Sequence, residues 1–284
     1  MINRKVSLSL LLNIVYSIGI ISIIIFTILP IVFALGSSLR TDEEIFHYAA
    51  PLTLNTFLPV NVNFDSYLKL FVQYSFWKPV LNSLVVSAAT VIFGFFVNAL
   101  AGYAFAKYNF KGKNVLFAFY LFTFMIPFEM IAVPLYKTAE NLHLIDTYAA
   151  LILPMVANGM IVFLYRQFFK DIPDSLMEAA VIDGAGKVRI FFQIIVPISR
   201  PVIISASLMM FIKQWDAFLW PMIATTKNNM KVIQVAISGF TLEFTVLWSV
   251  IFAATVIAIF IPVCILIPLQ KYYIKGAATS GLKE

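Results

Sequence analysis

Residues 8–35 read LSLLLNIVYSIGIISIIIFTILPIVFAL, an apolar run that contains no charged residue. An α-helix rises about 1.5 Å per residue, so this run would extend about 42 Å, enough to cross the core of a bilayer and both interfaces. It is too long for the roughly 7–15-residue apolar region of a signal peptide. Arg4 and Lys5 precede it, which favours an uncleaved span that enters from the cytoplasm.

The composition of the whole chain agrees with a membrane protein. Of its 284 residues, 61% are hydrophobic and 12% are charged, and the mean hydropathy is +0.92. Soluble domains have about 45–50% apolar and about 25% charged residues, so a soluble protein is excluded. Several other apolar runs are as long as a spanning helix, whereas a membrane β-barrel has short alternating segments. The predicted fold class is therefore all-α, a polytopic bundle of membrane helices.

Six apolar runs predict six transmembrane helices within a single transmembrane domain, residues 1–284. The predicted spans are 8–35, 80–106, 115–136, 148–168, 201–224 and 246–269. The mixed segment from Gly36 to Lys78 is expected to form an external loop with short interfacial helices. Pro127 and Pro134 interrupt the third span, and a proline breaks the hydrogen-bond ladder of a helix.

The distribution of basic residues tests the number of spans. With the amino terminus inside, the cytoplasmic segments contain Arg4, Lys5, Lys107, Lys111, Lys113, Arg166, Lys170, Lys187, Arg189, Arg200, Lys271, Lys275 and Lys283. The external segments contain Arg40, Lys69, Lys78, Lys137, Lys227 and Lys231. This asymmetry follows the positive-inside rule and places both termini in the cytoplasm. The net charge of +6 then reflects cytoplasmic loops and anionic lipid, and no nucleic-acid partner is expected.

Polar side chains inside the predicted spans are candidates for a substrate path or gate. Lipid offers such groups no partner, so they normally face other helices or a water-filled cavity. Two interpretations stay open, namely structural hydrogen bonds and contacts with a substrate. The candidates are Asn82, Asn98, Asn158, Trp215 and Asp216.

Other classes of site and function find little support in the residues. Cys264 lies alone in an apolar run, which favours a buried structural cysteine, and no metal site is expected. His47 and His143 both fall in loops, so no catalytic constellation of an intramembrane enzyme emerges. A secondary transporter or a channel is the alternative function, but no internal repeat is evident and Lys213 with Asp216 is the one close ionisable pair in a span.

The most polar passage in the second half of the chain is 171–200, between the fourth and fifth spans. Pro173 and the sequence Ser175-Leu176-Met177-Glu178 match a helix start and a capping box. Gly184 and Gly186 permit a sharp turn after this helix. A second, amphipathic segment from Lys187 to Ile195 would place Phe191, Ile194 and Ile195 on one face. The passage therefore predicts a helix-turn-helix on the cytoplasmic surface.

The residues Gly184-Ala185-Gly186-Lys187-Val188 look superficially like the end of a phosphate-binding loop. That motif requires glycine five residues before Gly186 and Ser or Thr after the lysine, and these positions hold Val181 and Val188. No nucleotide site is encoded here, so an active transporter with this chain would take its energy from another subunit.

Three separated motifs resemble one known family. Glu178-Ala179-Ala180, Gly184, Ile194 and Pro197 reproduce the EAA loop of bacterial ABC importer permeases, with Val196 in place of the usual leucine. Residues 215–221, WDAFLWP, and residues 270–276, QKYYIKG, look like the carbohydrate-uptake branch of that family. Within this branch, the chain is similar to the second maltose-type permease subunit.

The resemblance implies a function and a set of partners. The EAA loop of such permeases forms a coupling helix that docks on a cytoplasmic ATPase. The implied ATPase-docking residues are Glu178, Ala179, Ala180, Asp183, Gly184 and Ala185. The chain would pair with a second, different permease subunit, two ATPase subunits that hold ATP and Mg, and an extracellular or periplasmic sugar-binding protein. It would then hold no cofactor, would not be an enzyme, and would lie in the bacterial cell membrane.

The external loop after the fifth span is the implied contact with the sugar-binding protein. Its candidate residues are Lys227, Asn228 and Asn229. The transported compound is expected to be a sugar, specifically an oligosaccharide or a glycoside.

Overall fold

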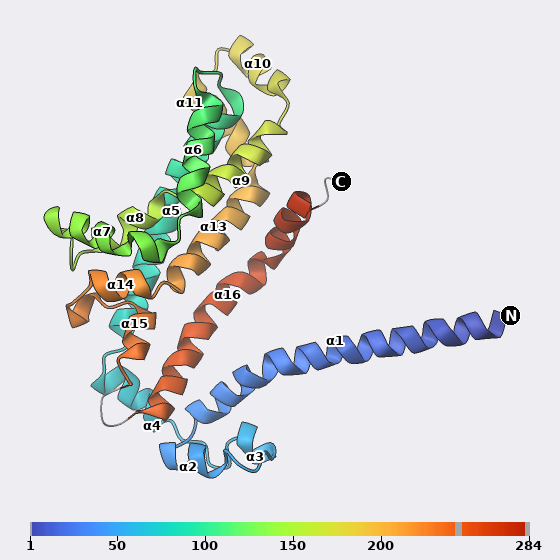
Figure 1. Ribbon diagram of the computed structural model, residues 1–284, viewed down its shortest axis with the longest axis vertical. Coiled ribbons are helices and arrows are strands. Elements are labelled where there is room, and N and C mark those ends of the chain that lie inside the picture. The colour runs from blue at the N-terminus through green and yellow to red at the C-terminus, as the bar shows by residue number, and fades with distance from the viewer. Residues whose placement is uncertain (1, 242–245, 282–284) are drawn as a thin grey trace. The chain divides into compact units, whose positions relative to one another are not determined.

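The computed structural model describes residues 2–241 and 246–281, and the side chains of 13–241 and 246–271. The chain divides into two compact units, each described by itself below (Figure 1). Unit 1 contains Met1–Phe76 and Ile237–Phe260, and unit 2 contains Trp77–Ala236 and Ile261–Glu284. Within the described residues both units are built of helices and loops, with one isolated β-bridge between Thr241 and Val246. The all-α prediction is confirmed.

Unit 1 contains the first long helix and several short ones. Its helices are α1 (Ile2–Ser38), α2 (Asp42–His47), α3 (Leu54–Phe57), α4 (Asp65–Leu68), the π-helix η1 (Lys69–Gln73) and the first part of α16 (Trp248–Gly281). The guanidinium of buried Arg40 donates hydrogen bonds to the carbonyls of Asn55, Thr56 and Leu58, which ties α3 to the end of α1. The expected loop of short helices is therefore an ordered cap.

Unit 2 contains the elements that bear on function. They are α5 (Trp77–Lys107), α6 (Lys113–Met125), α7 (Phe128–Asn141), α8 (Tyr148–Val156), α9 (Gly159–Lys170), α10 (Asp174–Ile182), α11 (Lys187–Ile190), the π-helix η2 (Phe191–Ile195), α12 (Val196–Ile198), α13 (Arg200–Trp215), α14 (Leu219–Ala224) and the 3₁₀-helix η3 (Asn228–Met230). Helix α15 (Ile233–Ser238) begins in unit 2 and ends in unit 1.

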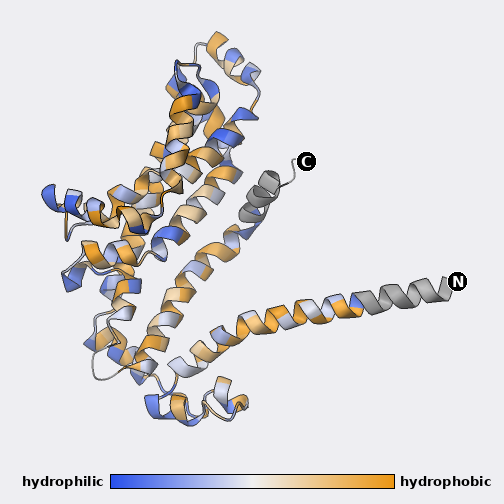
Figure 2. Ribbon diagram, viewed as in Figure 1, coloured by the Kyte–Doolittle hydropathy of each residue, from blue (hydrophilic) through white to orange (hydrophobic). Residues whose placement is uncertain are grey.

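Helices α5, α9 and α13 pack side by side and form the centre of unit 2 (Figure 1). Small residues allow the close approach of α5 to α9, because a Cβ at Gly102 would lie 2.6 Å from the Cβ of Tyr165 and 3.2 Å from the Val162 carbonyl. Figure 2 shows apolar residues along these helices and hydrophilic residues towards the two ends of the unit. This is the pattern expected of helices surrounded by lipid.

Three helices are long and apolar enough to cross a membrane: Asn13–Ser38 of α1, Trp77–Lys107, and Trp248–Lys271 of α16. Three further candidates are pairs of helices joined at a bend, so the total is six if each pair is one span. Three predicted spans differ from the structure, and the fourth of the six, predicted as 148–168, bends by 44° between α8 and α9. The third bends by 97° between α6 and α7, at the Ile126-Pro127 break. The fifth, predicted as 201–224, ends as a helix at Trp215, and α14 follows as a separate short helix.

Cys264 lies on α16 and is exposed. The expectation of a buried structural cysteine is wrong, because the helix turns this side chain away from the core. An apolar position in a sequence does not distinguish a lipid-facing residue from a core residue, since both environments exclude water.

Candidate functional site

Helix α10 carries the first half of the 171–200 passage. It begins at Asp174 after Pro173, and no side-chain cap is formed, so the predicted Ser175–Glu178 capping box is wrong. Its end is well defined, because the amide of Gly184 donates to the Val181 carbonyl (3.0 Å) and that of Ala185 to the Ala180 carbonyl (2.8 Å). These two bonds make a Schellman turn, and Gly184 adopts the required left-handed φ of 76°. The predicted turn at Gly184 is confirmed.

The outer face of α10 and its C-cap combine two acidic residues with exposed apolar ones. Glu178, Ala179 and Asp183 are exposed. Val181 and Ile182 are exposed as well, and Ile182 keeps 85% of its surface accessible. An aliphatic side chain this exposed at the tip of a structure is typical of a surface that a partner covers. Sequence reasoning missed Val181 and Ile182, although their place directly after the EAA motif was visible.

Ala180 lies on the inner face of α10 and does not form part of the accessible surface. Only 7% of it is exposed, and it packs in a core with Ile172 and with residues of α5, α9 and α13. Its expected place among the ATPase-docking residues is corrected accordingly: the alanine fills a site inside this chain. Ala185 is half-buried against the same core, and Gly184 is exposed.

Polar contacts from α5 hold the start of α10 in place. Lys107, the last residue of α5, forms an ion pair with Asp174 (2.7 Å) and donates a second bond to the Ile172 carbonyl. One turn earlier, the hydroxyl of Tyr103 lies 3.6 Å from the sulfur of Met177. Helix α10 is thus fixed to the bundle along its inner face, while its outer face stays open.

The second half of the passage returns the chain to α13. Ile190, Phe191 and Ile195 are buried, while exposed Arg189 donates to Gln193 (2.8 Å), so the predicted amphipathic segment is confirmed. The segment passes through η2 and α12 and meets α13 at an angle of 84°. The bend lies at Ser199, next to the prolines that flank it in the sequence.

A cavity of about 270 Å³ lies in the bundle beside the break between α8 and α9. Thr90, Tyr120, Thr123, Asn158, Lys213 and Gln214 provide its polar lining, and Phe124, Phe128 and Met155 are among its apolar residues. Thr90 is buried, and its hydroxyl has no hydrogen-bond partner among the described residues. Of the five predicted path residues, only Asn158 lines this cavity.

Asn98 and Asn158 satisfy the backbone at that break. The Asn98 amide donates to the carbonyls of Gly94 (2.6 Å) and Val156 (2.7 Å), and its oxygen accepts from the backbone amide of Asn158 (2.8 Å). The Asn158 side chain then caps α9 by accepting from Met160 and Ile161. Helices α8 and α9 meet at 44° here, and interrupted helices are tolerated in membranes only where the freed backbone groups find partners.

Asn82 has a structural set of partners at the other end of α5. Its amide donates to the carbonyls of Asn229 and Lys231, both at 2.9 Å, and its oxygen accepts from the hydroxyl of Tyr148 (2.6 Å). The buried side chain therefore holds the segment 229–231 against α5 and α8. Lys227, Asn228 and Asn229 themselves are exposed, as a contact surface requires.

Asp146 fixes the start of the same loop. Its carboxylate accepts from the backbone amide (2.6 Å) and hydroxyl (2.6 Å) of Thr226 and from the backbone amide of Lys227 (2.9 Å). These bonds, first the one from the Thr226 hydroxyl, hold the pKa of Asp146 below its usual value. No sequence signal pointed to this role, because Asp146 and Thr226 are 80 residues apart in the chain.

Trp215 and Asp216 occupy the end of α13. Trp215 is buried and stacks on Phe211 with ring centres 5.7 Å apart. Asp216 follows as the exposed C-cap of the helix. Neither residue lines the cavity, although Lys213 and Gln214 of the same turn do.

Solved structures share this fold. The chain superposes on a chain of a bacterial ABC transporter involved in the import of the acidic polysaccharide alginate, with a TM-score of 0.82 over 93% of this chain and 96% of that one. The sequences are 21% identical, so this likeness concerns the fold. A second structure, the bacterial alginate ABC transporter in complex with alginate pentasaccharide-bound periplasmic protein, gives a TM-score of 0.67.

Sequence comparisons identify the relatives. The chain is 31% identical to the arabinooligosaccharides transport system permease protein AraQ of Bacillus subtilis, covering 89% of this chain and 90% of the relative. It is also 31% identical to the sn-glycerol-3-phosphate transport system permease protein UgpE of Escherichia coli, covering 92% of each. Residues 91–276 match the profile of one protein family. The chain therefore belongs to the family of binding-protein-dependent transport system inner membrane components.

Proposed function

We propose that this multi-pass membrane protein is a permease subunit of an ATP-driven importer for an oligosaccharide or a glycoside. The name of the relative that transports arabinooligosaccharides supports this class of substrate, whereas the substrate in the name of the other relative, sn-glycerol-3-phosphate, is a phosphorylated polyol. The chain would work with a second, different permease subunit, two ATPase subunits that bind ATP and Mg, and a sugar-binding protein outside the membrane. Both termini would lie in the cytoplasm, in keeping with the distribution of basic residues.

The observation that carries the coupling role is the exposed outer face of α10. Glu178 would meet basic or polar groups of an ATPase subunit, and Ala179 would allow close approach. Val181 and Ile182 would enter an apolar groove of that subunit. Burial of one such side chain contributes about 1.5–3 kcal/mol to the free energy of binding. The face thus combines charge, which orients a partner, with apolar area, which binds it.

Motion of the ATPase would reach the membrane helices through the inner face of α10. Ala180 and Ile172 share a core with α5, α9 and α13, and Lys107 pairs with Asp174. A displaced α10 would therefore carry the ends of these helices with it. Rigid-body motion of this kind suits alternation between inward- and outward-facing states.

The cavity between α8, α9 and α13 is the proposed part of the sugar path in this chain. Sugars are held by hydrogen bonds to their hydroxyls and by aromatic faces. The free hydroxyl of Thr90, the amide of Asn158 and the ring of Tyr120 offer both kinds of contact. Asn82, Asn98, Trp215 and Asp216 would act by holding structure or forming a gate.

The loop that contains Lys227, Asn228 and Asn229 is the proposed contact with the sugar-binding protein. Its backbone is fixed from both sides, by Asp146 at Thr226 and Lys227 and by Asn82 at Asn229. A loop that is already ordered loses less conformational entropy when a partner binds.

Replacement of Ile182 by serine tests the docking surface. We expect the ATPase subunits to bind about 10–100-fold more weakly, because the variant loses the burial of one large aliphatic side chain. Leu142→Ser is the matched control, since Leu142 is also exposed but lies at the end of α7. Association is measured by co-purification and by binding-protein-stimulated ATPase activity. Equal ATPase association of both variants and the parent protein would show that α10 is not the docking helix.

A further inference from the structure

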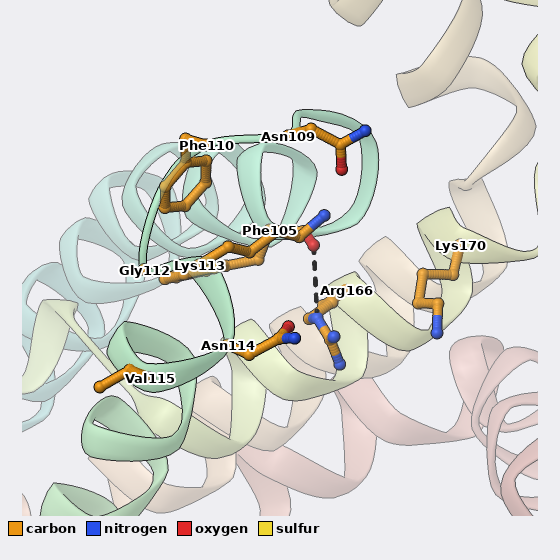
Figure 3. Close-up of a pocket in the computed structure, with 9 residues that line it drawn as sticks. All are labelled: Phe105, Asn109, Phe110, Gly112, Lys113, Asn114, Val115, Arg166 and Lys170. Atoms are coloured by element: carbon orange, nitrogen blue, oxygen red, sulfur yellow. Dashed lines mark hydrogen bonds between the residues drawn. The ribbon is translucent and has the colours of Figure 1, made fainter.

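A basic recess of about 480 Å³ lies at the end of unit 2 where α5, α6 and α9 meet (Figure 3). It is separate from the coupling surface of α10 and from the cavity beside Asn158. Its lining comes from the end of α5, the loop that follows, the first turn of α6 and the last two turns of α9. The lining residues are Phe105, Asn109, Phe110, Gly112, Lys113, Asn114, Val115, Arg166 and Lys170.

Three of these side chains are cations and none is an acid. Lys113 comes from α6, whereas Arg166 and Lys170 come from the same face of α9. Asp171 follows Lys170 in the chain but is not part of the lining. Like charges gathered in one recess repel one another, so the arrangement is stabilised when an anion binds between them.

Arg166 is held in an orientation that suits an anion. Its Nε donates to the Phe105 carbonyl (3.3 Å), and its guanidinium lies 4.0 Å above the ring of Phe117. In the described part of the chain its two Nη groups make no hydrogen bond, and they remain available as a two-donor fork. Planar forks of this type bind phosphate oxygens with two parallel bonds.

Two other groups complete the recess. The ammonium of Lys113 donates to the Tyr108 carbonyl (2.8 Å), which holds it at the rim. Gly112 precedes α6 and offers no side-chain cap; the Lys113 amide donates to the Phe110 carbonyl (3.3 Å), and no side chain caps the amides of Asn114 and Val115. Uncapped amides at the start of a helix favour an anion, which adds to the effect of the cations.

The surface next to the recess is apolar and accessible. Along α6, Val115, Leu116, Phe119 and Phe122 are all exposed. The basic residues at this end belong to the cytoplasmic set by the positive-inside rule, so the recess would lie at the inner membrane interface. A ligand that fits both the basic recess and the apolar face of α6 has an anionic head group and hydrocarbon chains. We propose that the recess binds the phosphate of an anionic phospholipid head group.

A lipid-binding measurement tests this site. The full-length chain, purified with its partner subunits, is titrated with phosphatidylglycerol or with phosphatidylcholine of the same acyl chains, and bound lipid is counted by native mass spectrometry. The double variant Lys113→Gln/Lys170→Gln retains Arg166 and its packing. Each cation near anionic lipid contributes roughly a fivefold change in binding, so we expect about 25-fold weaker binding of phosphatidylglycerol to the double variant.

Lys111→Gln is the matched control, because Lys111 is exposed in the same loop but does not line the recess. It should bind phosphatidylglycerol like the parent protein, and the melting temperatures of all variants show whether folding is intact. An equal loss of phosphatidylglycerol binding in the control and in the double variant would refute the proposed site. Competition by millimolar inorganic phosphate, with no preference for phosphatidylglycerol over phosphatidylcholine, would identify a soluble anion and overturn the lipid.

Discussion

Replacement of Asn98 by alanine should destabilise the break between α8 and α9. The buried side chain makes three hydrogen bonds, to Gly94, Val156 and Asn158. At the average of about 0.6 kcal/mol measured between membrane helices, the three bonds sum to about 2 kcal/mol. Two of the partners, the Val156 carbonyl and the Asn158 amide, would be left unpaired at the break, at a cost of roughly 1–3 kcal/mol each. The cost of the two unpaired backbone groups should exceed the loss of the hydrogen bonds themselves, because backbone groups at a helix break have no alternative partner in lipid.

Reversible unfolding in mixed micelles measures this difference. We expect the free energy of unfolding of Asn98→Ala to fall by about 2–6 kcal/mol. Asn109→Ala is the matched control, since Asn109 is an exposed residue of the loop after α5 and should change stability by less than about 0.5 kcal/mol. A loss for Asn98→Ala no larger than that of the control would refute the assignment of Asn98 as the residue that holds the break.

Two further changes probe the loop and the bundle. The lowered pKa of Asp146 means that the ordered loop favours the ionised carboxylate. The hydrogen bonds of this carboxylate therefore contribute their full stabilisation above the ordinary Asp pKa of about 3.9, and this stabilisation is lost only as the pH falls through the lowered value. Hydrogen exchange at the Lys227 amide, corrected for its intrinsic rate, should therefore show equal protection at pH 5 and pH 8. The same amide should exchange faster in Asp146→Asn. A loss of protection between pH 8 and pH 5 would contradict this account. Gly102→Ala places a methyl 2.6 Å from the Cβ of Tyr165 and should reduce stability by about 1–3 kcal/mol, whereas Gly19→Ala, with nothing within 4 Å, should not.

The parts of the fold that depend on local chemistry were predictable. Apolar length identifies the membrane helices, and the turn at Gly184 follows from a glycine that can adopt positive φ. The places where helices bend were harder to assign. Pro127 marks a break in the predicted third span, but no local residue pattern encodes its angle of 97°. The end of α13 at Trp215 was missed, although the polar residues from Lys213 to Asp216 lie there, because apolar residues continue after them.

In the candidate sites, too, features that depend on local sequence were predictable and contacts between distant residues were not. The EAA motif locates the helix, but the burial of Ala180 depends on residues of α5, α9 and α13 that are distant in sequence. Asn82 and Asn98 stood out in the sequence as polar residues inside a predicted span. Apart from the Gly94 carbonyl, their hydrogen-bond partners are 58 to 149 residues away in the chain, so these contacts follow only from the folded structure.

The burial of Ala180 beside exposed Ala179 has an evolutionary consequence. If α10 docks on the ATPase as proposed, exposed Ala179 can change together with the surface of that partner, and its history should follow that of the ATPase gene. Ala180 is confined by side chains of this same chain, and a larger residue there would require smaller ones in α5 or α9. Under the proposed docking role, two adjacent alanines of one short motif would therefore be under selection from two different genes.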